Sequence, residues 1–221
     1  MSKIEGIRLK INKFFRLTFA EKRKKKLKNQ NFTIISNNCW GGMIYESYNL
    51  RKNSPTVGLF IMPKDYIKFI KNLKKYLKIK LTFIKPEDSK YTDVLKNDSR
   101  FGSYPIGKLG DIEIMFLHYK NEKEAYEKWE RRKQRINFDN IIYKFNDQNG
   151  CTKSDFYEFV NLPLPNKLFF TVKDWDRPLN SDSKNICVMK INQLFNKDFV
   201  FASREPFGNK ITEYINNIMI K

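Results

Sequence analysis

The sequence predicts an α/β protein of three layers, α/β/α, in which helices cover both faces of a mainly parallel or mixed sheet. Two observations lead to this prediction. Short runs rich in β-branched and aromatic residues alternate with segments of helical spacing along most of the 221 residues, and strands that alternate with helices build βαβ units. No segment rich in proline, glycine and serine divides the chain. We therefore expect a basic segment at 1–29 and a single domain over 30–221.

The strand predictions rest on short apolar runs that end in polar residues or glycine. Residues 32–36 form the first run, and the polar loop Ser36–Gly42 follows it. Residues 85–103 are polar and are predicted as a long loop. The predicted strands are 32–36, 56–61, 79–84, 112–118, 140–145 and 167–172, with further candidates at 185–189 and 199–202.

The helix predictions rest on apolar residues at helical spacing and on the residues that begin a helix. Pro63 begins one helix, at a position where its missing N–H costs nothing, and an apolar stripe continues to Leu77. Asn121 with Glu124 is the pattern of a capping box and predicts a helix over 121–135. Further helices are predicted over 3–19, 154–161 and 209–220.

The N-terminal segment carries a large share of the positive charge. Residues 1–30 contribute +9 to the formal net charge of +19, from eleven Lys and Arg against Glu5 and Glu21. In the helix over 3–19, isoleucines and phenylalanines share one face, with lysine and arginine between them. This pattern is typical of a helix that lies in the interface of an anionic membrane. Alternatively, the apolar face docks on the protein's own core or on a partner chain, and part of the charge is ordinary solvated surface.

Composition argues against several classes of protein. No apolar run approaches the roughly 18 residues of a membrane span, and residues 1–20 lack the apolar stretch of a secretory signal. Cys39, Cys151 and Cys187 are too widely spaced for a disulfide framework or zinc, which predicts a reducing, cytoplasmic location. With a single histidine, no metal site is expected. No dinucleotide or Walker fingerprint points to a cofactor, and no oligomeric state is indicated.

The loop Ser36–Gly42 is the strongest candidate for a substrate site. Ligands of open α/β sheets bind beyond the carboxyl ends of the strands. Gly41 and Gly42 would let the backbone approach a ligand or take a positive φ, and N–H groups at the start of the next helix would bind phosphate. Trp40 would offer a flat face to a sugar or base. The predicted hydrogen-bonding side chains are those of Ser36, Asn37 and Asn38.

Cys39 and His118 are the predicted catalytic residues. A helix N-terminus would lower the pKa of the Cys39 thiol, and the thiolate is the reactive form. Otherwise, this loop is a tight turn with a buried cysteine and a packing tryptophan. His118 is the natural general base because its ordinary pKa lies near neutrality, although a lone histidine at a strand end more often has a structural role.

Two further residues complete the predicted site. If the strands are parallel, the loops that follow them share one edge of the sheet, which would bring Cys39, His118 and Asp174 together. Arg132 lies on the buried stripe of its helix, where an arginine needs a fixed partner, either a carboxylate or a ligand phosphate.

Several stretches of the sequence together resemble one bacterial family. They are IISNNCWGG at 34–42, NSPTVGLF at 53–60, YPIGKLGDIEI at 104–114, FLHY at 116–119, KWERR at 128–132 and RINFDN at 135–140. Over roughly residues 30–205, this combination resembles the bacterial domain of unknown function 1919 family, whose members are often labelled as exopolysaccharide or capsule biosynthesis proteins. The resemblance implies a three-layered α/β fold and a role in surface-polysaccharide assembly.

Three functions remain open from the sequence. The first is a transferase that uses a phosphate-bearing activated sugar or acyl donor and a glycan acceptor, with Cys39 and His118 in catalysis. The second is a non-catalytic scaffold of polysaccharide assembly, held peripherally on the inner face of the membrane. The third, a nucleic-acid binder, is disfavoured because it rests on charge alone, without a recognised binding motif.

Overall fold

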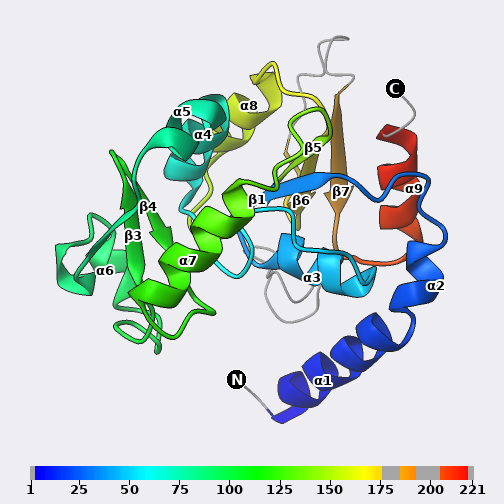
Figure 1. Cartoon of the computed structure of the whole chain (residues 1–221), viewed down its shortest axis with the longest axis horizontal. Coiled ribbons are helices and arrows are strands. Elements are labelled where there is room, and N and C mark those ends of the chain that lie inside the picture. The colour runs from blue at the N-terminus through cyan, green and yellow to red at the C-terminus, as the bar shows by residue number, and fades with distance from the viewer. Residues whose placement is uncertain (1–2, 176–184, 193–204, 219–221) are drawn as a thin grey trace.

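Four parallel strands form the central sheet of this computed structural model, which describes residues 3–175, 185–192 and 205–218 (Figure 1). Neighbouring strands are parallel throughout, and Ser36 lies beside Lys144 in the register of the first pair. In spatial order, the strands are β1 (Thr33–Ser36), β5 (Ile141–Asn146), β6 (Lys167–Thr171) and β7 (Ile186–Lys190). The predicted α/β fold class is confirmed.

One face of this sheet is covered by helices that carry many aromatic side chains. Phe145 and Phe169 point to this face, with ring centroids 5.5 Å apart, and Phe156 of α8 lies 4.8 Å from Phe169. Aromatic pairs at such distances contribute beyond the area that they bury. The helices that contribute to this core are α4 (Pro63–Lys71), α5 (Leu73–Lys78), α7 (Glu122–Lys133) and α8 (Lys153–Asn161).

The other face of the sheet packs against α3 (Trp40–Ser47) and α9 (Asn209–Ile218). Ile34, Ile142 and Phe170 point to this side, because successive side chains of a strand alternate between the two faces. The sheet therefore lies between two helical layers, as the sequence predicts.

Two helices precede β1 in the chain. These are α1 (Lys3–Thr18) and α2 (Ala20–Lys24). Leu27, which follows them, packs in the core on the α3 side of the sheet. The division of the chain at residue 29 stays a prediction.

A second, antiparallel sheet lies beside β1. Its strands are β2 (Thr82–Ile84), β3 (Ile106–Leu109) and β4 (Ile112–Met115), in that order. Phe60 and Met115 exchange two backbone hydrogen bonds of 2.9 Å, and the N–H of Ile61 donates to the carbonyl of Asn37 at 2.9 Å. The strand predicted at 56–61 is thus reduced to a bridge that connects the two sheets.

The antiparallel sheet is the main departure from the predicted fold. The run predicted as the fourth strand contains β4, which pairs with β3 rather than with the parallel strands. β3 is absent from the predicted strands because Gly107 interrupts its apolar pattern. A Cβ at Gly107 would lie 2.6 Å from Cε2 of Phe116, so close packing requires the glycine. The predicted loop at 85–103 contains η1 (Pro86–Asp88) and α6 (Thr92–Leu95).

The predicted helices are present, and one of them is divided. Asn121 caps α7, and its Oδ1 accepts a hydrogen bond from the N–H of Glu124 at 2.9 Å. The helix predicted from Pro63 to Leu77 is divided at Asn72 into α4 and α5. The strand predicted at 199–202 lies outside the described residues.

Gly41 and Gly42 lie inside α3 and allow this helix to approach its neighbours closely. A Cβ on Gly41 would lie 3.1 Å from Cγ2 of Ile34, and one on Gly42 would lie 2.9 Å from Cγ1 of Val57. Neither glycine has a positive φ. Of the two alternatives predicted for these glycines, the positive φ is therefore wrong, and close packing of α3 accounts for both residues.

Gly42→Ala is expected to lower the free energy of unfolding by about 1–3 kcal/mol, the usual cost of overpacking a core. In a Val57→Ala background, the obstructing methyl group is gone, and the better helix propensity of alanine should make the substitution neutral or stabilising by up to about 1 kcal/mol. Urea unfolding of the four proteins measures the difference. An equal cost in both backgrounds would show that contact with Val57 is not the constraint.

Candidate functional site

Polar side chains gather where β1 and β5 end. Asn37 and Asn38 follow β1, and Asn146 is the last residue of β5. The Nδ2 of Asn37 donates to Oδ1 of Asn146 at 2.8 Å, and the Nδ2 of Asn38 donates to Oε1 of Gln148 at 3.3 Å. Because β1 and β5 are parallel neighbours, the loops that follow them meet at one edge of the sheet.

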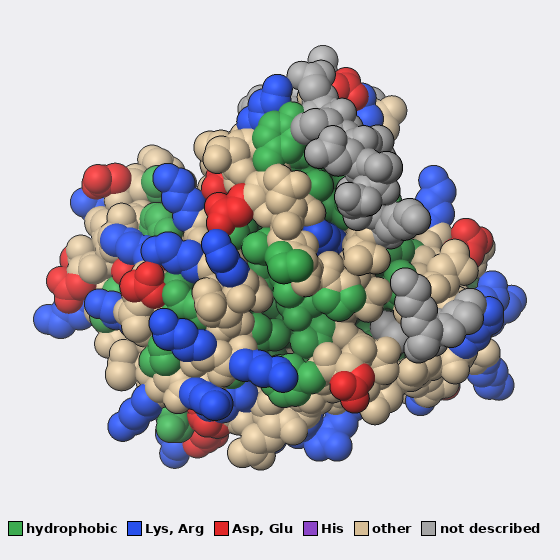
Figure 2. Space-filling view, turned by 90° about the horizontal axis from the view of Figure 1, so that it is seen from above, with side chains coloured by type: hydrophobic (Ala, Val, Ile, Leu, Met, Phe, Trp, Pro, Cys, Tyr) green, Lys and Arg blue, Asp and Glu red, His purple; other side chains and the backbone are tan. Residues whose placement is uncertain are grey.

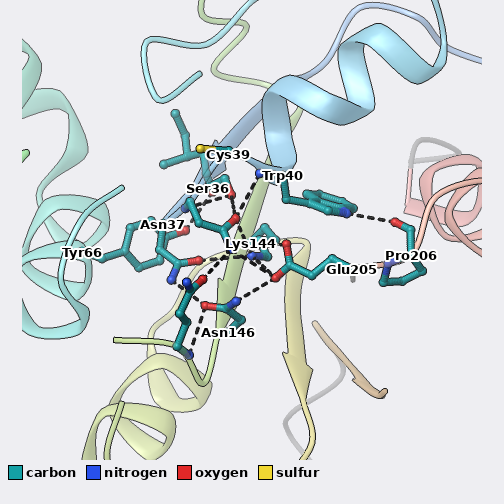
Figure 3. A network of polar contacts seen from close by, with 12 residues as sticks. Ser36, Asn37, Cys39, Trp40, Tyr66, Lys144, Asn146, Glu205 and Pro206 are labelled. Atoms are coloured by element: carbon teal, nitrogen blue, oxygen red, sulfur yellow. Dashed lines mark hydrogen bonds and ion pairs between the residues drawn. The ribbon is translucent and has the colours of Figure 1, made fainter. Parts of the chain in front are cut away.

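A buried ion pair between Lys144 and Glu205 lies at the centre of this cluster (Figure 3). The Nζ of Lys144 lies 2.5 Å from Oε1 of Glu205, and both side chains are fully buried. The same Nζ donates to Oδ1 of Asn38 at 2.8 Å and to Oδ1 of Asn37 at 3.3 Å. Glu205 also accepts from Nδ2 of Asn146 at 2.8 Å and from Nδ2 of Asn38 at 3.3 Å. These five side chains form one polar network.

Burial controls the electrostatics of the ion pair. Loss of solvent lowers the pKa of Lys144 to about 8 and raises the pKa of Glu205, while the attraction between the two groups opposes both shifts. Removing two charges from water is costly unless further hydrogen bonds satisfy them. Asn37, Asn38 and Asn146 supply these bonds, so the network requires all of its members.

Ser36 and Trp40 support this network instead of contacting solvent. The Oγ of Ser36 donates to Oδ1 of Asn38 at 3.2 Å, and Ser36 is fully buried. Trp40 is 1% exposed, and its Nε1 donates to the carbonyl of Pro206 at 2.9 Å. The Nζ of Lys144 lies 5.9 Å from the Trp40 ring centroid. Protein covers the face that was predicted to stack on a sugar or base, so the alternative of a packing tryptophan is correct.

Cys39 is the N-cap of α3, so it lies at a helix N-terminus as the sequence predicts, and its side chain is half-buried. The Sγ donates to the carbonyl of Leu59 at 3.7 Å, and burial raises the pKa of the thiol to about 12. The field of a helix N-terminus is worth at most about 2 kcal/mol, and here the loss of solvent outweighs it. The predicted lowering of the pKa is therefore wrong.

His118 and Asp174 take no part in the hydrogen bonds and the ion pair of this network. His118 follows β4 in the antiparallel sheet, and its side chain is exposed, although partial desolvation lowers its pKa. Asp174 is exposed and forms an ion pair of 2.6 Å with Lys190. The assumption that β4 belongs to the parallel sheet is wrong, whereas the predicted convergence of Cys39, His118 and Asp174 stays a prediction.

Arg132 has the fixed partners that its buried position requires, but neither is a carboxylate. Its Nη1 donates to the hydroxyl of Tyr119 at 2.6 Å and to the carbonyl of Val57 at 3.3 Å. Tyr119 also donates to the carbonyl of Val57. In these contacts Arg132 fixes the segment before the bridge at Phe60, which is a structural role.

A cleft of about 840 Å³ opens beside the network, between the carboxyl edge of the parallel sheet and the segment around α6. Asn38 and Cys39 line it, but His118 is not among its described lining residues. Its other polar and basic lining side chains include Lys64, Asn97, Arg100, Gln148 and Asn149. Its apolar side is formed by Phe60, Met62, Tyr91, Val94, Leu95 and Leu117.

The charged side chains that line the cleft differ in whether they already have a hydrogen-bond or ion-pair partner. Arg100 forms an ion pair of 3.0 Å with Asp98. Lys64 lies in the first turn of α4, is exposed, and makes no ion pair with any described residue. Asp155 accepts hydrogen bonds from the N–H and hydroxyl of Thr152 in a capping box. Within the described parts of the chain, no three Asp, Glu, His or Cys side chains are grouped so that they could hold a metal ion.

Comparison with known proteins shows the family of this chain. Residues 10–198 match the family described as Domain of unknown function (DUF1919). The chain belongs to the DUF1919 family. An "Uncharacterized protein" of Haemophilus influenzae (strain ATCC 51907 / DSM 11121 / KW20 / Rd) is 37% identical over 175 residues, which cover 79% of this chain and 78% of that protein. The predicted family is confirmed, and the match begins inside α1, earlier than the resemblance indicated.

The sequence interpretation missed the central ion pair of this DUF1919 chain. Lys144 occurs within the apolar run of β5, where every residue is buried, and a lysine at such a position requires a partner. That signal could have been found. Glu205 is far from Lys144 in the sequence and lies outside every predicted helix and strand, so nothing local identifies it as the partner.

Lys144→Met and Glu205→Gln are each expected to lower the free energy of unfolding by about 3–5 kcal/mol, because each leaves a buried charge uncompensated. The double variant should lose less than the sum of the two costs. Lys167→Met is a matched control, since this buried lysine of β6 donates to the carbonyls of Val160 and Leu162. Its cost should add to that of Glu205→Gln. Additive costs for Lys144 and Glu205 in urea unfolding would contradict a coupled pair.

Cys39 is expected to react slowly with iodoacetamide at neutral pH, because little of its thiol is ionised when the pKa is about 12. Mass-spectrometric mapping should show slower alkylation of Cys39 in the folded chain than in the urea-unfolded chain. If Cys39 instead reacts fastest of the three cysteines in the folded protein, its thiol is activated and the burial argument fails.

Proposed function

We propose that this protein binds a phosphate-bearing activated donor in the cleft and transfers its activated group to a glycan acceptor during surface-polysaccharide assembly. The observation that carries the proposal is the cleft at the ends of β1 and β5, whose volume of about 840 Å³ lies within the range of small-molecule sites, about 300–1,000 Å³. The class of donor follows from the lining of the cleft, and the biological process follows from the family resemblance.

The start of α4 supports binding of the donor phosphate. Pro63 and Lys64 line the cleft at this helix end, which carries a partial positive charge. Met62, the N-cap, provides no side-chain hydrogen bond, whereas Thr152 and Asp155 already satisfy the start of α8. Lys64 would therefore contact the phosphate, and Arg100 would approach it from the other wall.

The rest of the lining supports an organic group attached to that phosphate. Phe60, Met62 and Leu117 form an apolar side suited to a base, an acyl chain or the face of a sugar. Gln148 and Asn149 offer amide donors and acceptors for hydroxyl groups. Asn38 is fixed by the ion pair of Lys144 and Glu205, so the wall of the cleft to which it belongs is preorganised.

The basic surface of the protein supports an anionic ligand as well. Lysine and arginine side chains are prominent on the face in Figure 2, where hydrophobic side chains gather near the centre. A net charge of +19 attracts anions over distances set by the ionic strength.

The proposed transfer is direct: a hydroxyl of the acceptor displaces the phosphate of the donor, the released phosphate takes up the hydroxyl proton, and no covalent intermediate forms on Cys39. The raised pKa of this thiol argues against a nucleophile at neutral pH, and His118 is not among the lining residues. The same two observations favour a second candidate, a non-catalytic module that binds the donor or its carrier and organises other assembly enzymes. Turnover of a bound donor separates the two.

The experiment is a thermal-shift screen with nucleotide sugars, acyl-coenzyme A and polyprenyl phosphates. A ligand at about 100 times its Kd should stabilise the fold by about 2.7 kcal/mol. Lys64→Ala should weaken binding roughly tenfold or more, since a charge-assisted hydrogen bond is worth about 1.5–3 kcal/mol. Lys75→Ala is the control, because Lys75 is exposed on α5 and does not line the cleft.

Three results decide between the candidates. Stabilisation that depends on Lys64, followed by donor consumption when a glycan acceptor is added, supports the transferase. Binding without consumption supports the organising module. If no ligand class stabilises the protein, or if Lys64→Ala and Lys75→Ala bind equally well, the assignment of the cleft as the donor site is wrong.

A further inference from the structure

The helix α1 presents an apolar face to solvent. Ile7, Ile11 and Phe14 recur at helical spacing and are 58%, 49% and 63% exposed. Phe15 and Leu17 are also exposed. In Figure 1, α1 extends along the outside of the molecule, near α2 and α3 and away from the central sheet. The largest apolar side chains of this helix therefore lack cover from the described part of the chain.

The side of α1 that meets the body is mainly polar. Four residues of α1 line a small cavity together with Trp40 and Phe207, namely Leu9, Asn12, Lys13 and Arg16. The Nη2 of Arg16 lies 3.8 Å from Oε2 of Glu46 on α3, and Arg16 is half-buried. A surface helix normally turns its apolar stripe to the core and its polar side to water. In α1 this arrangement is reversed.

Basic residues flank the exposed apolar face and continue beyond it. Lys10 is exposed on α1, and Lys22, Lys25 and Lys26 are exposed in the segment that follows. Residues 1–30 carry a net charge of +9. Each lysine or arginine near an anionic membrane surface contributes about 1 kcal/mol. A second copy of the chain fits this face poorly, because two such segments would repel each other.

We propose that α1 lies in the plane of an anionic membrane surface, with Ile7, Ile11 and Phe14 inserted between the lipids and the flanking lysines on the headgroups. The apolar stripe would be buried among the lipid chains, and the basic residues would complement the negative charge of the headgroups. These two features together are typical of an interfacial helix. In the described parts of the chain, no helix is both long and apolar enough to cross a membrane, so the proposed contact is peripheral.

The test is co-sedimentation of the full chain with vesicles of phosphatidylcholine alone or with phosphatidylglycerol added. The wild type should bind the anionic vesicles, bind the neutral vesicles much less, and lose binding as salt rises. The triple variant Ile7→Ser, Ile11→Ser, Phe14→Ser should bind at least about tenfold more weakly, because it removes the inserted apolar surface. Its melting temperature should stay close to that of the wild type, since these side chains are already exposed.

Phe138→Ser combined with Tyr126→Ser is the matched control, because these exposed aromatic residues lie outside α1 and do not line the cleft. This variant should bind anionic vesicles as the wild type does. Equal binding by the wild type and the α1 triple variant would overturn the proposal. Equal binding to neutral and anionic vesicles, or concentration-dependent dimers that the triple variant abolishes, would also overturn it. Donor binding in the cleft should be unchanged in the triple variant, so this result stands apart from the proposed function.

Discussion

The buried ion pair between Lys144 and Glu205 constrains the whole carboxyl edge of the parallel sheet. Lys144 belongs to β5, whereas Glu205 lies shortly before α9, so the pair ties the C-terminal region to the middle of the sheet. Removing either charge from water costs free energy unless other groups satisfy it. Each charge satisfies the other, and the side chains of Asn38 and Asn146 complete their hydrogen bonding. The position of the loop after β1, and hence one wall of the cleft, follows from this requirement.

Much of the fold could be predicted because the pattern of a few neighbouring residues determines whether they form a helix or a strand. The apolar runs of β1, β5 and β6 and the cap of α7 at Asn121 are properties of a few neighbouring residues. Strand direction and order are not local properties. The run that contains β4 was therefore assigned to the parallel sheet, and β3 was missed because Gly107, which its packing against Phe116 requires, breaks the pattern.

The sequence predicts the position of the candidate site better than it predicts the roles of the residues in it. The loop after β1 does lie beside a cleft, and Asn37 and Asn38 are part of the network. Trp40 and Cys39 were given chemical roles that depend on exposure to solvent, which tertiary packing decides. Burial of Trp40 and the raised pKa of Cys39 both arise from this packing. α1 is the reverse case, since its apolar face is exposed although apolar stripes usually pack inward.

Hydrogen exchange followed by mass spectrometry tests the central role of the ion pair most directly. In Lys144→Met, exchange should increase together in the loop after β1 and in α9, because the interaction that holds both is lost, while β2, β3 and β4 should keep the exchange rates of the wild type. Lys167→Met, which changes another buried lysine of the same sheet, should not loosen α9. An increase confined to the neighbourhood of residue 144, with α9 unchanged, would contradict the account.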